Sequence, residues 1–124
     1  MELIPGGTVR TLKNPGVSSR QLLCPDNSSG ARVTLTEVRV EPGAVQPRHS
    51  HEGSEQVWYA LCGAGRLLLA EGAEAPFAAG DVVRFACGET HGLRNDADGE
   101  LVYLSVTSPP LSFRAAYQSE SAPH

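Results

Sequence analysis

Two blocks of the sequence decide its fold: GAVQPRHSHEGSEQVWYALCG at residues 43–63 and GDVVRFACGETHGLRN at residues 80–95. The first block contains His49 and His51, which are separated by one residue. In an extended strand this spacing places both imidazoles on the same face, close enough to share one cation. His91, in the second block, can reach the pair only if the chain folds back across a barrel. Because an isolated His-x-His pair is more often a solvated or core pair than a metal site, the surrounding pattern has to decide.

Short strands separated by turns extend outward from the two blocks. Thirteen Gly and nine Pro are more than a helical domain tolerates, because each of them weakens or breaks a helix interior. Runs of strand length recur at roughly ten-residue intervals with turn residues between them, which is typical of a sandwich or barrel. We therefore expect an all-β fold. The expected strands are residues 8–12, 17–23, 32–40, 56–61, 66–71, 76–78, 82–85 and 101–107.

Length and composition indicate a single domain over residues 1–124, with 40% apolar and 19% charged residues. The net charge of −4 lacks the basic excess that nucleic-acid binding requires. No apolar run approaches the roughly 20 residues that span a bilayer, and residues 1–5 contain no signal-peptide core. We expect a cytoplasmic protein with neither a nucleic-acid nor a membrane partner.

The C-terminal segment, residues 111–124, carries Phe113 and Tyr117 after the last expected strand. These aromatic residues predict an arm that packs on its own barrel or on a neighbouring one. We expect its last residues, Ser119 to His124, to be frayed.

The Gly, His and Asn spacing in the two blocks resembles the paired motifs of the cupin superfamily, G(x)5HxH(x)3-4E(x)6G and G(x)5PxG(x)2H(x)3N. The resemblance covers residues 43–95, with Ala86 in place of the motif's proline. It implies a double-stranded β-helix, the cupin jelly-roll barrel, in which His49, His51 and His91 are metal ligands. The motif glycines and Asn95 are expected to shape turns.

The remaining ligand of the first motif is either Glu55 or Gln56. Counting forward from His51 gives Glu55, whereas counting back from Gly63 gives Gln56. Only one of the two can face inward, because consecutive strand residues point to opposite faces. We favour Gln56, since the strand before Gly63 is regular and the loop at residues 52–54 can absorb one residue.

Three imidazoles and an amide or carboxylate oxygen suit one divalent transition metal per chain, such as Fe, Mn, Ni, Cu or Zn, rather than Ca or Mg. Trp58 shares the phase of Gln56, and Tyr103 and Ser105 share a phase on the last expected strand. We expect these three side chains to line a cavity for a small-molecule ligand, although ordinary barrel wall is the alternative for each.

The resemblance implies a metal-dependent enzyme that acts on a small oxygenated organic molecule, and we favour an oxygenase-type reaction. Four protein ligands on a six-coordinate metal would leave positions open for chemistry. Similar proteins include lyases, isomerases and cyclases, and a noncatalytic cupin that binds a metabolite or a metal is a further alternative. We also expect a homodimer, because one barrel leaves too much apolar surface uncovered. The apolar face in question contains Val57, Tyr59, Leu61, Val102, Leu104 and Val106, together with the arm.

Overall fold

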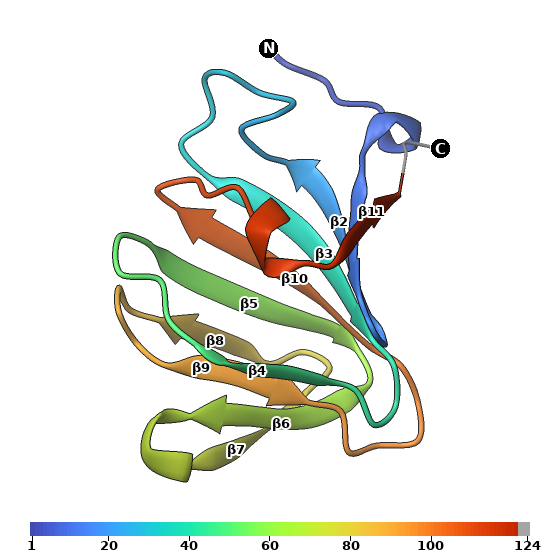
Figure 1. Cartoon of the computed structure of the whole chain (residues 1–124), viewed down its shortest axis with the longest axis vertical. Helices are drawn as coiled ribbons and strands as arrows, with labels where there is room; N and C mark the ends of the chain where they lie inside the picture. The colour runs from blue at the N-terminus through green and yellow to red at the C-terminus, as the bar shows by residue number, and fades with distance from the viewer. Residues whose placement is uncertain (122–124) are drawn as a thin grey trace.

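The computed structural model describes residues 1–121, in which antiparallel strands form two sheets (Figure 1). The large sheet has the order β11-β1-β2-β3-β10-β5-β8. Its strands are β1 (Thr11–Asn14), β2 (Val17–Leu23), β3 (Thr34–Val40), β5 (Glu55–Cys62), β8 (Val82–Phe85), β10 (Leu101–Ser108) and β11 (Ser119–Ser121). The small sheet has the order β4-β9-β6-β7. Its strands are β4 (Val45–His49), β6 (Ala64–Leu69), β7 (Glu74–Ala78) and β9 (His91–Arg94). The expected all-β jelly-roll barrel is confirmed.

Short 3₁₀ turns are the helical elements of the described chain, and they are η1 (Gly6–Thr8), η2 (Ala70–Gly72) and η3 (Arg114–Ala116). None of these described turns has the length and apolar character needed to cross a membrane.

The core lies between the sheets and is built from alternate residues of their strands. On β5 the inward residues are Trp58 and Ala60, and on β3 they are Val38 and Val40. Aromatic and leucine side chains from the other strands complete this cluster, among them Phe77, Phe85, Leu93, Leu101 and Tyr103.

Gly63 closes the β5–β6 turn with a φ of 83°, and a Cβ at this position would overlap the backbone oxygen of Glu100. Only glycine tolerates both conditions, so the turn expected at Gly63 is confirmed. Asn95 shapes the next loop as expected, because its amide donates to the backbone oxygens of Val40 and Gly99 at 2.9 Å each.

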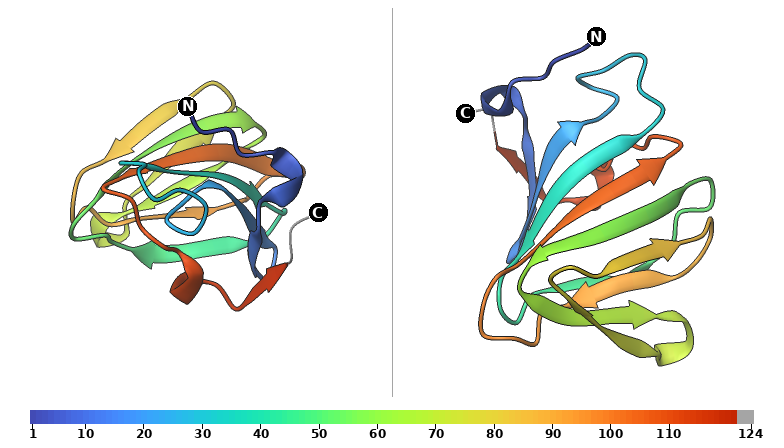
Figure 2. Two further views of the ribbon diagram at one scale, coloured as in Figure 1. Left: turned by 90° about the horizontal axis from the view of Figure 1, so that it is seen from above. Right: turned by 180° about the vertical axis from the view of Figure 1, so that it is seen from behind.

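The C-terminal residues correct one prediction. Ser119–Ser121 are not frayed but form β11, which pairs with β1 at the edge of the large sheet (Figure 2). The arm packs on its own barrel, where Tyr117 contacts the core cluster. The rest of the expected frayed segment, including His124, lies outside the described residues.

The outer face of the large sheet is partly as expected. Tyr59, Leu61 and Val82 are exposed at 44%, 43% and 65%. Val102, however, is only 4% exposed, beside a register shift between Val102 and Tyr103 that bends β10. The expectation that Val102 contributes to an open apolar face is therefore wrong.

Candidate metal centre

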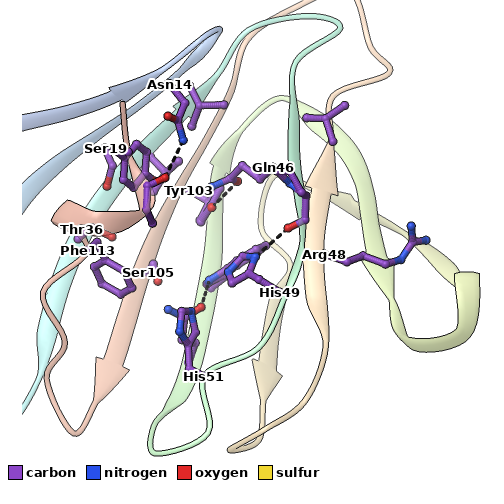
Figure 3. A pocket seen from close by; sticks show the side chains of 18 residues that line it. Asn14, Ser19, Thr36, Gln46, Arg48, His49, His51, Tyr103, Ser105 and Phe113 are labelled. Atoms are coloured by element: carbon purple, nitrogen blue, oxygen red, sulfur yellow. Dashed lines mark hydrogen bonds between the residues drawn. The ribbon is translucent and has the colours of Figure 1, made fainter. Parts of the chain in front are cut away.

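Three histidines lie close together in the structure, and Figure 3 shows two of them, His49 and His51, beside the cavity. His49 ends β4, His51 follows in the loop, and His91 begins β9 directly opposite His49 in the β4–β9 register. One ring nitrogen from each residue lies within 4.8 Å of the others. β4 ends at His49, so the His-x-His pair spans the end of a strand and the loop that follows it. The chain folds back to bring His91 to the pair, as expected.

Backbone carbonyls orient two of the imidazoles. Nδ1 of His49 lies 2.8 Å from the oxygen of Pro47, and Nδ1 of His91 lies 2.9 Å from the oxygen of Glu89. Because a carbonyl oxygen only accepts, each Nδ1 carries a proton, which leaves Nε2 as the ring nitrogen available to a metal.

The Nε2 atoms of His51 and His91 are buried and have no hydrogen-bond partner among the described residues. Buried polar atoms are rarely left without a partner, because an unpaired one costs free energy. Two such nitrogens facing a third imidazole fit the donor set of a divalent transition metal.

Burial favours the neutral form of two of the three imidazoles. Burial is the main reason that the pKa of His91 is lowered to about 4, and the neighbouring His49 and His51 contribute to this decrease. Burial also lowers the pKa of His51, with a smaller contribution from His49. A neutral imidazole is the form that binds a metal, so these two residues are ready for coordination at pH 7.

Packing fixes the position of His91 within the barrel. Its ring stacks on Phe85 with a centroid distance of 4.5 Å and an interplanar angle of 14°. Trp58 meets the same ring edge-on at 5.5 Å. These contacts restrict rotation of the imidazole and hold it next to the other two histidines.

The two candidates for the fourth ligand face opposite sides of β5. Gln56 is 4% exposed and lines the cavity beside His49 and His51, whereas Glu55 forms a 2.7 Å ion pair with Arg84 on the outer surface. The side chain of Gln56 is also engaged within the wall. Its Oε1 accepts from Trp58 Nε1 at 3.1 Å, and its Nε2 donates to Thr107 Oγ1 at 3.0 Å. The structure therefore places Gln56 in the cavity with one hydrogen bond already made to its carbonyl oxygen.

The three predicted substrate contacts all line a cavity of about 270 Å³ beside the histidines. Trp58 and Tyr103 stack with a centroid distance of 4.5 Å, and Ser105 lies on β10 directly opposite Trp58. The hydroxyl of Tyr103 donates to Gln46 Oε1 at 2.7 Å, so it is already used within the wall. Burial raises the pKa of Tyr103 well above its ordinary value, which keeps this hydroxyl protonated.

The cavity residues that the sequence analysis did not identify include Gln46, Thr36 and Phe113. Thr36 had a usable signal, because it shares the inward phase of Val38 on β3 and lies opposite Ser105 in the register. Phe113 had none, since its place over the cavity depends on how the arm packs. Its ring lies 5.8 Å from that of His51.

Comparison with known proteins gives one family. A family model described as "Cupin domain" matches residues 36–107, which include all three histidines. A curated relative named oxalate-binding protein, from Thermotoga maritima, is 33% identical over 72 residues. That match covers 58% of this chain and 59% of the relative, so it spans less than two thirds of the relative's length.

Two solved structures extend the similarity to most of the barrel. The polyketide cyclase RemF from Streptomyces resistomycificus is 25% identical with a TM-score of 0.73, covering 98% of this chain and 84% of that one. A Thermotoga maritima protein named as a predicted oxalate decarboxylase is 28% identical with a TM-score of 0.68, covering 75% and 80%. The family match, the barrel and the positions of the histidines agree, and the chain belongs to the cupin family.

Proposed function

We propose that this protein binds one divalent transition metal through His49, His51 and His91 and acts on a small oxygenated organic molecule in the adjacent cavity. The observation that carries the proposal is the pair of buried, unpartnered Nε2 atoms on His51 and His91 among the described residues. Fe, Mn, Ni, Cu and Zn all suit this donor set. When bound, such a metal supplies a Lewis acid that attracts ligand oxygen atoms.

Gln56 is our proposed fourth ligand. A carbonyl oxygen has two lone pairs, and the bond from Trp58 uses one of them. The hydrogen bond to Thr107 fixes the amide plane, so the remaining lone pair has a defined direction. Glu55 is unsuited to this role because its carboxylate lies outside, paired with Arg84.

The walls of the cavity position the ligand and restrict water. Trp58 and Tyr103 form a rigid aromatic surface beside the histidines, and Phe113 approaches His51 from the arm. Thr36 and Ser105 add adjacent hydroxyl-bearing side chains on β3 and β10. We propose that Trp58, Tyr103 and Ser105 contact the ligand, with Tyr103 doing so through its ring, since its hydroxyl is bonded to Gln46.

An oxygenase-type reaction is our leading proposal for the chemistry. It is tested by loading the protein with Fe(II) without oxygen and then measuring oxygen uptake with diketones, phenolics and hydroxy acids. We expect uptake with at least one class, and its loss in His49→Ala. Ser50→Ala is the matched control, because Ser50 lies between the two histidines and its hydroxyl faces Glu52 instead.

A noncatalytic binding role is the second candidate, and the relative named oxalate-binding protein favours it. Oxygen uptake and product formation that stay at background with every metal and substrate class would support this role and contradict the oxygenase proposal. Product formation without oxygen uptake would instead indicate a lyase, isomerase or cyclase, in keeping with the structural similarity to a polyketide cyclase.

We also propose a homodimer formed through the outer face of β5, β8 and β10. Tyr59 lies between Val82 and Leu104 in the strand register, so these exposed or half-buried side chains form one continuous apolar patch. The arm is not needed for this interface, because it packs on its own barrel. Light scattering should give twice the 13.1 kDa mass of one chain, and Val82→Glu should return the single-chain mass. A single-chain mass for the unmodified protein at micromolar concentration would contradict the dimer.

The cytoplasmic location stays a prediction.

A further inference from the structure

Charged groups are scarce in the metal cavity. Among the described lining residues, Arg48 alone carries a fixed charge. Its guanidinium turns away to the small sheet, where Nε donates to the oxygen of Leu69 at 2.8 Å and Nη2 donates to that of Ala73 at 3.4 Å (Figure 3). Among the described residues, a ligand in the cavity therefore meets no cationic side chain away from the histidines.

Apart from the histidines and Arg48, the cavity is lined by aromatic, aliphatic and uncharged polar residues. The Trp58–Tyr103 stack forms one side, and Val17, Val38 and Phe113 are among the other lining residues. A water molecule occupies about 30 Å³ of liquid, so a cavity of about 270 Å³ holds far more than the few atoms of oxalate. The space beyond the metal ligands suits a flat apolar body rather than a second charged group.

Phe113 occupies a special position in this wall. It lines the metal cavity and also a second cavity of about 180 Å³ between β1, the Cys24 turn and the arm. Its ring therefore contributes to the boundary of both spaces. Replacing it with a small side chain would remove part of the surface on which a ligand body can pack.

The arm holds Phe113 firmly in place from both sides. Before it, the backbone of Leu111 exchanges two hydrogen bonds with the hydroxyl of Thr34, at 3.0 and 3.2 Å. After it, Asn14 Nδ2 donates to the oxygen of Ala116 at 3.0 Å, and Arg114 pairs with Asp26 and Glu120. A ring anchored in this way is a fixed wall of the site rather than a free loop side chain.

We infer that the ligand joins an oxygen-bearing head to a flat apolar body, and that Phe113 is a specificity-determining residue for that body. This inference rests on the proposed function, in which the histidine side of the cavity receives the head. The body lies against Trp58, Tyr103 and Phe113. Oxalate, which has a head but no body, is accordingly a poor ligand for this protein in spite of the names of two relatives.

Three probes with increasing apolar bodies test the inference: oxalate, salicylate and 3-hydroxy-2-naphthoate. Calorimetry on the Zn²⁺-loaded protein gives the Kd of each probe for the protein. This value is divided by the Kd of the same probe for free Zn²⁺ in the same buffer. The ratio removes the intrinsic affinity of the probe's oxygen-bearing head for Zn²⁺. We expect the naphthoate to bind about tenfold more tightly than salicylate on this corrected scale, because the second ring buries additional apolar surface. Oxalate should be the weakest of the three.

Phe113 variants then assign the effect to the arm. Phe113→Ala should reduce the preference for the naphthoate over salicylate to about threefold or less, while the Kd of oxalate changes less than about twofold, because only the body packs on this ring. Phe113→Leu, which retains apolar volume and disturbs the arm least, should fall between Phe113→Ala and the unmodified protein. Leu3→Ala is the control, since Leu3 is an apolar side chain that is 77% exposed and lines neither cavity.

Two outcomes would overturn the inference: corrected binding of oxalate that equals or exceeds that of the naphthoate, or a Phe113 effect of equal size on all three probes. A metal-free series separates this result from failure of the proposed function. If the protein takes up no Zn²⁺ but still binds the naphthoate in a Phe113-dependent way, the metal proposal fails and the role of Phe113 stands.

Discussion

Consecutive residues of strand β5 face two different environments. The inward residues Gln56, Trp58 and Ala60 are 4%, 2% and 0% exposed, whereas Tyr59 and Leu61 on the other face are 44% and 43% exposed. The inner side chains are connected by hydrogen bonds and ring contacts that lead to His91. The outer ones form an apolar patch. One strand thus serves the proposed metal site with one half of its residues and presents a separate surface with the other half.

This difference shows how much depends on a one-residue register. A shift of β5 by a single position would exchange Gln56 for Glu55 and Trp58 for Val57 in the cavity. The site would then gain a carboxylate and lose the indole that packs against His91. The predictions below test the two faces against each other.

The largest difference in stability is expected between alanine substitutions at Trp58 and at Tyr59. Trp58→Ala leaves a cavity among Phe77, Phe85 and Tyr103, so we expect a loss of about 3–5 kcal/mol in the free energy of unfolding. Tyr59→Ala, on the outer face, should cost less than about 1 kcal/mol. Urea unfolding followed by far-UV circular dichroism measures both. Equal losses would mean that the faces of β5 are not distinguished as described.

A smaller difference in stability and metal content is expected between alanine substitutions at Gln56 and at Glu55. Gln56→Ala leaves the buried groups of Trp58 and Thr107 without their partner, which should cost about 1–3 kcal/mol and lower the metal content. Gln56→Glu should tighten metal binding, because a carboxylate is a stronger donor for a cation than a neutral amide.

Glu55→Ala is the matched control for Gln56→Ala. It removes only an exposed ion pair with Arg84, so stability and metal content should stay near those of the unmodified protein. Mass spectrometry of folded samples measures the metal. If Glu55→Ala removed the metal while Gln56→Ala kept it, Glu55 would be the ligand and our assignment would be wrong.

An effect comparable to that of Gln56→Ala is expected from pH on the metal-free protein. The pKa of His91 is about 4 in the folded state, below the ordinary value of 6.5. The unfolded chain therefore binds more protons between these values, so stability is complete above pH 6.5 and falls as the pH drops toward 4. The urea midpoint should decrease between about pH 7 and about pH 5, and His91→Gln should reduce that decrease. An unchanged pH dependence in His91→Gln would show that another group is responsible.

The sequence predicts the strands whose signal is local. The alternation in residues 32–40 and 56–61 identifies β3 and β5 to within two residues, because side-chain phase repeats along each strand. β9 is missed because the sequence His-Gly-Leu-Arg lacks β-branched residues. Its Gly92 is needed for a reason visible only in three dimensions, since a Cβ there would lie 2.7 Å from the oxygen of Gln46.

The residues of the candidate site likewise fall into those that the sequence predicts and those that it does not. The spacing of the two motifs is enough to locate His49, His51 and His91, and the count back from Gly63 places Gln56 inside. Contacts made by distant segments are not encoded in such spacing. Phe113 reaches the cavity only because the arm crosses the barrel, and β11 forms only because it pairs with β1 near the other end of the chain.

Metal binding to the three histidines is the central claim, and one titration tests it most directly. Cu²⁺ is added to the metal-free protein while the fluorescence of Trp58, the single tryptophan of the chain, is recorded. Trp58 lies 5.5 Å from the ring of His91, so a paramagnetic ion at the site should quench it. We predict quenching that saturates at one Cu²⁺ per chain, an affinity roughly 100-fold weaker or more in His49→Ala, and an unchanged affinity in Ser50→Ala. Quenching that does not saturate at one equivalent, or that is the same in His49→Ala, would contradict the claim.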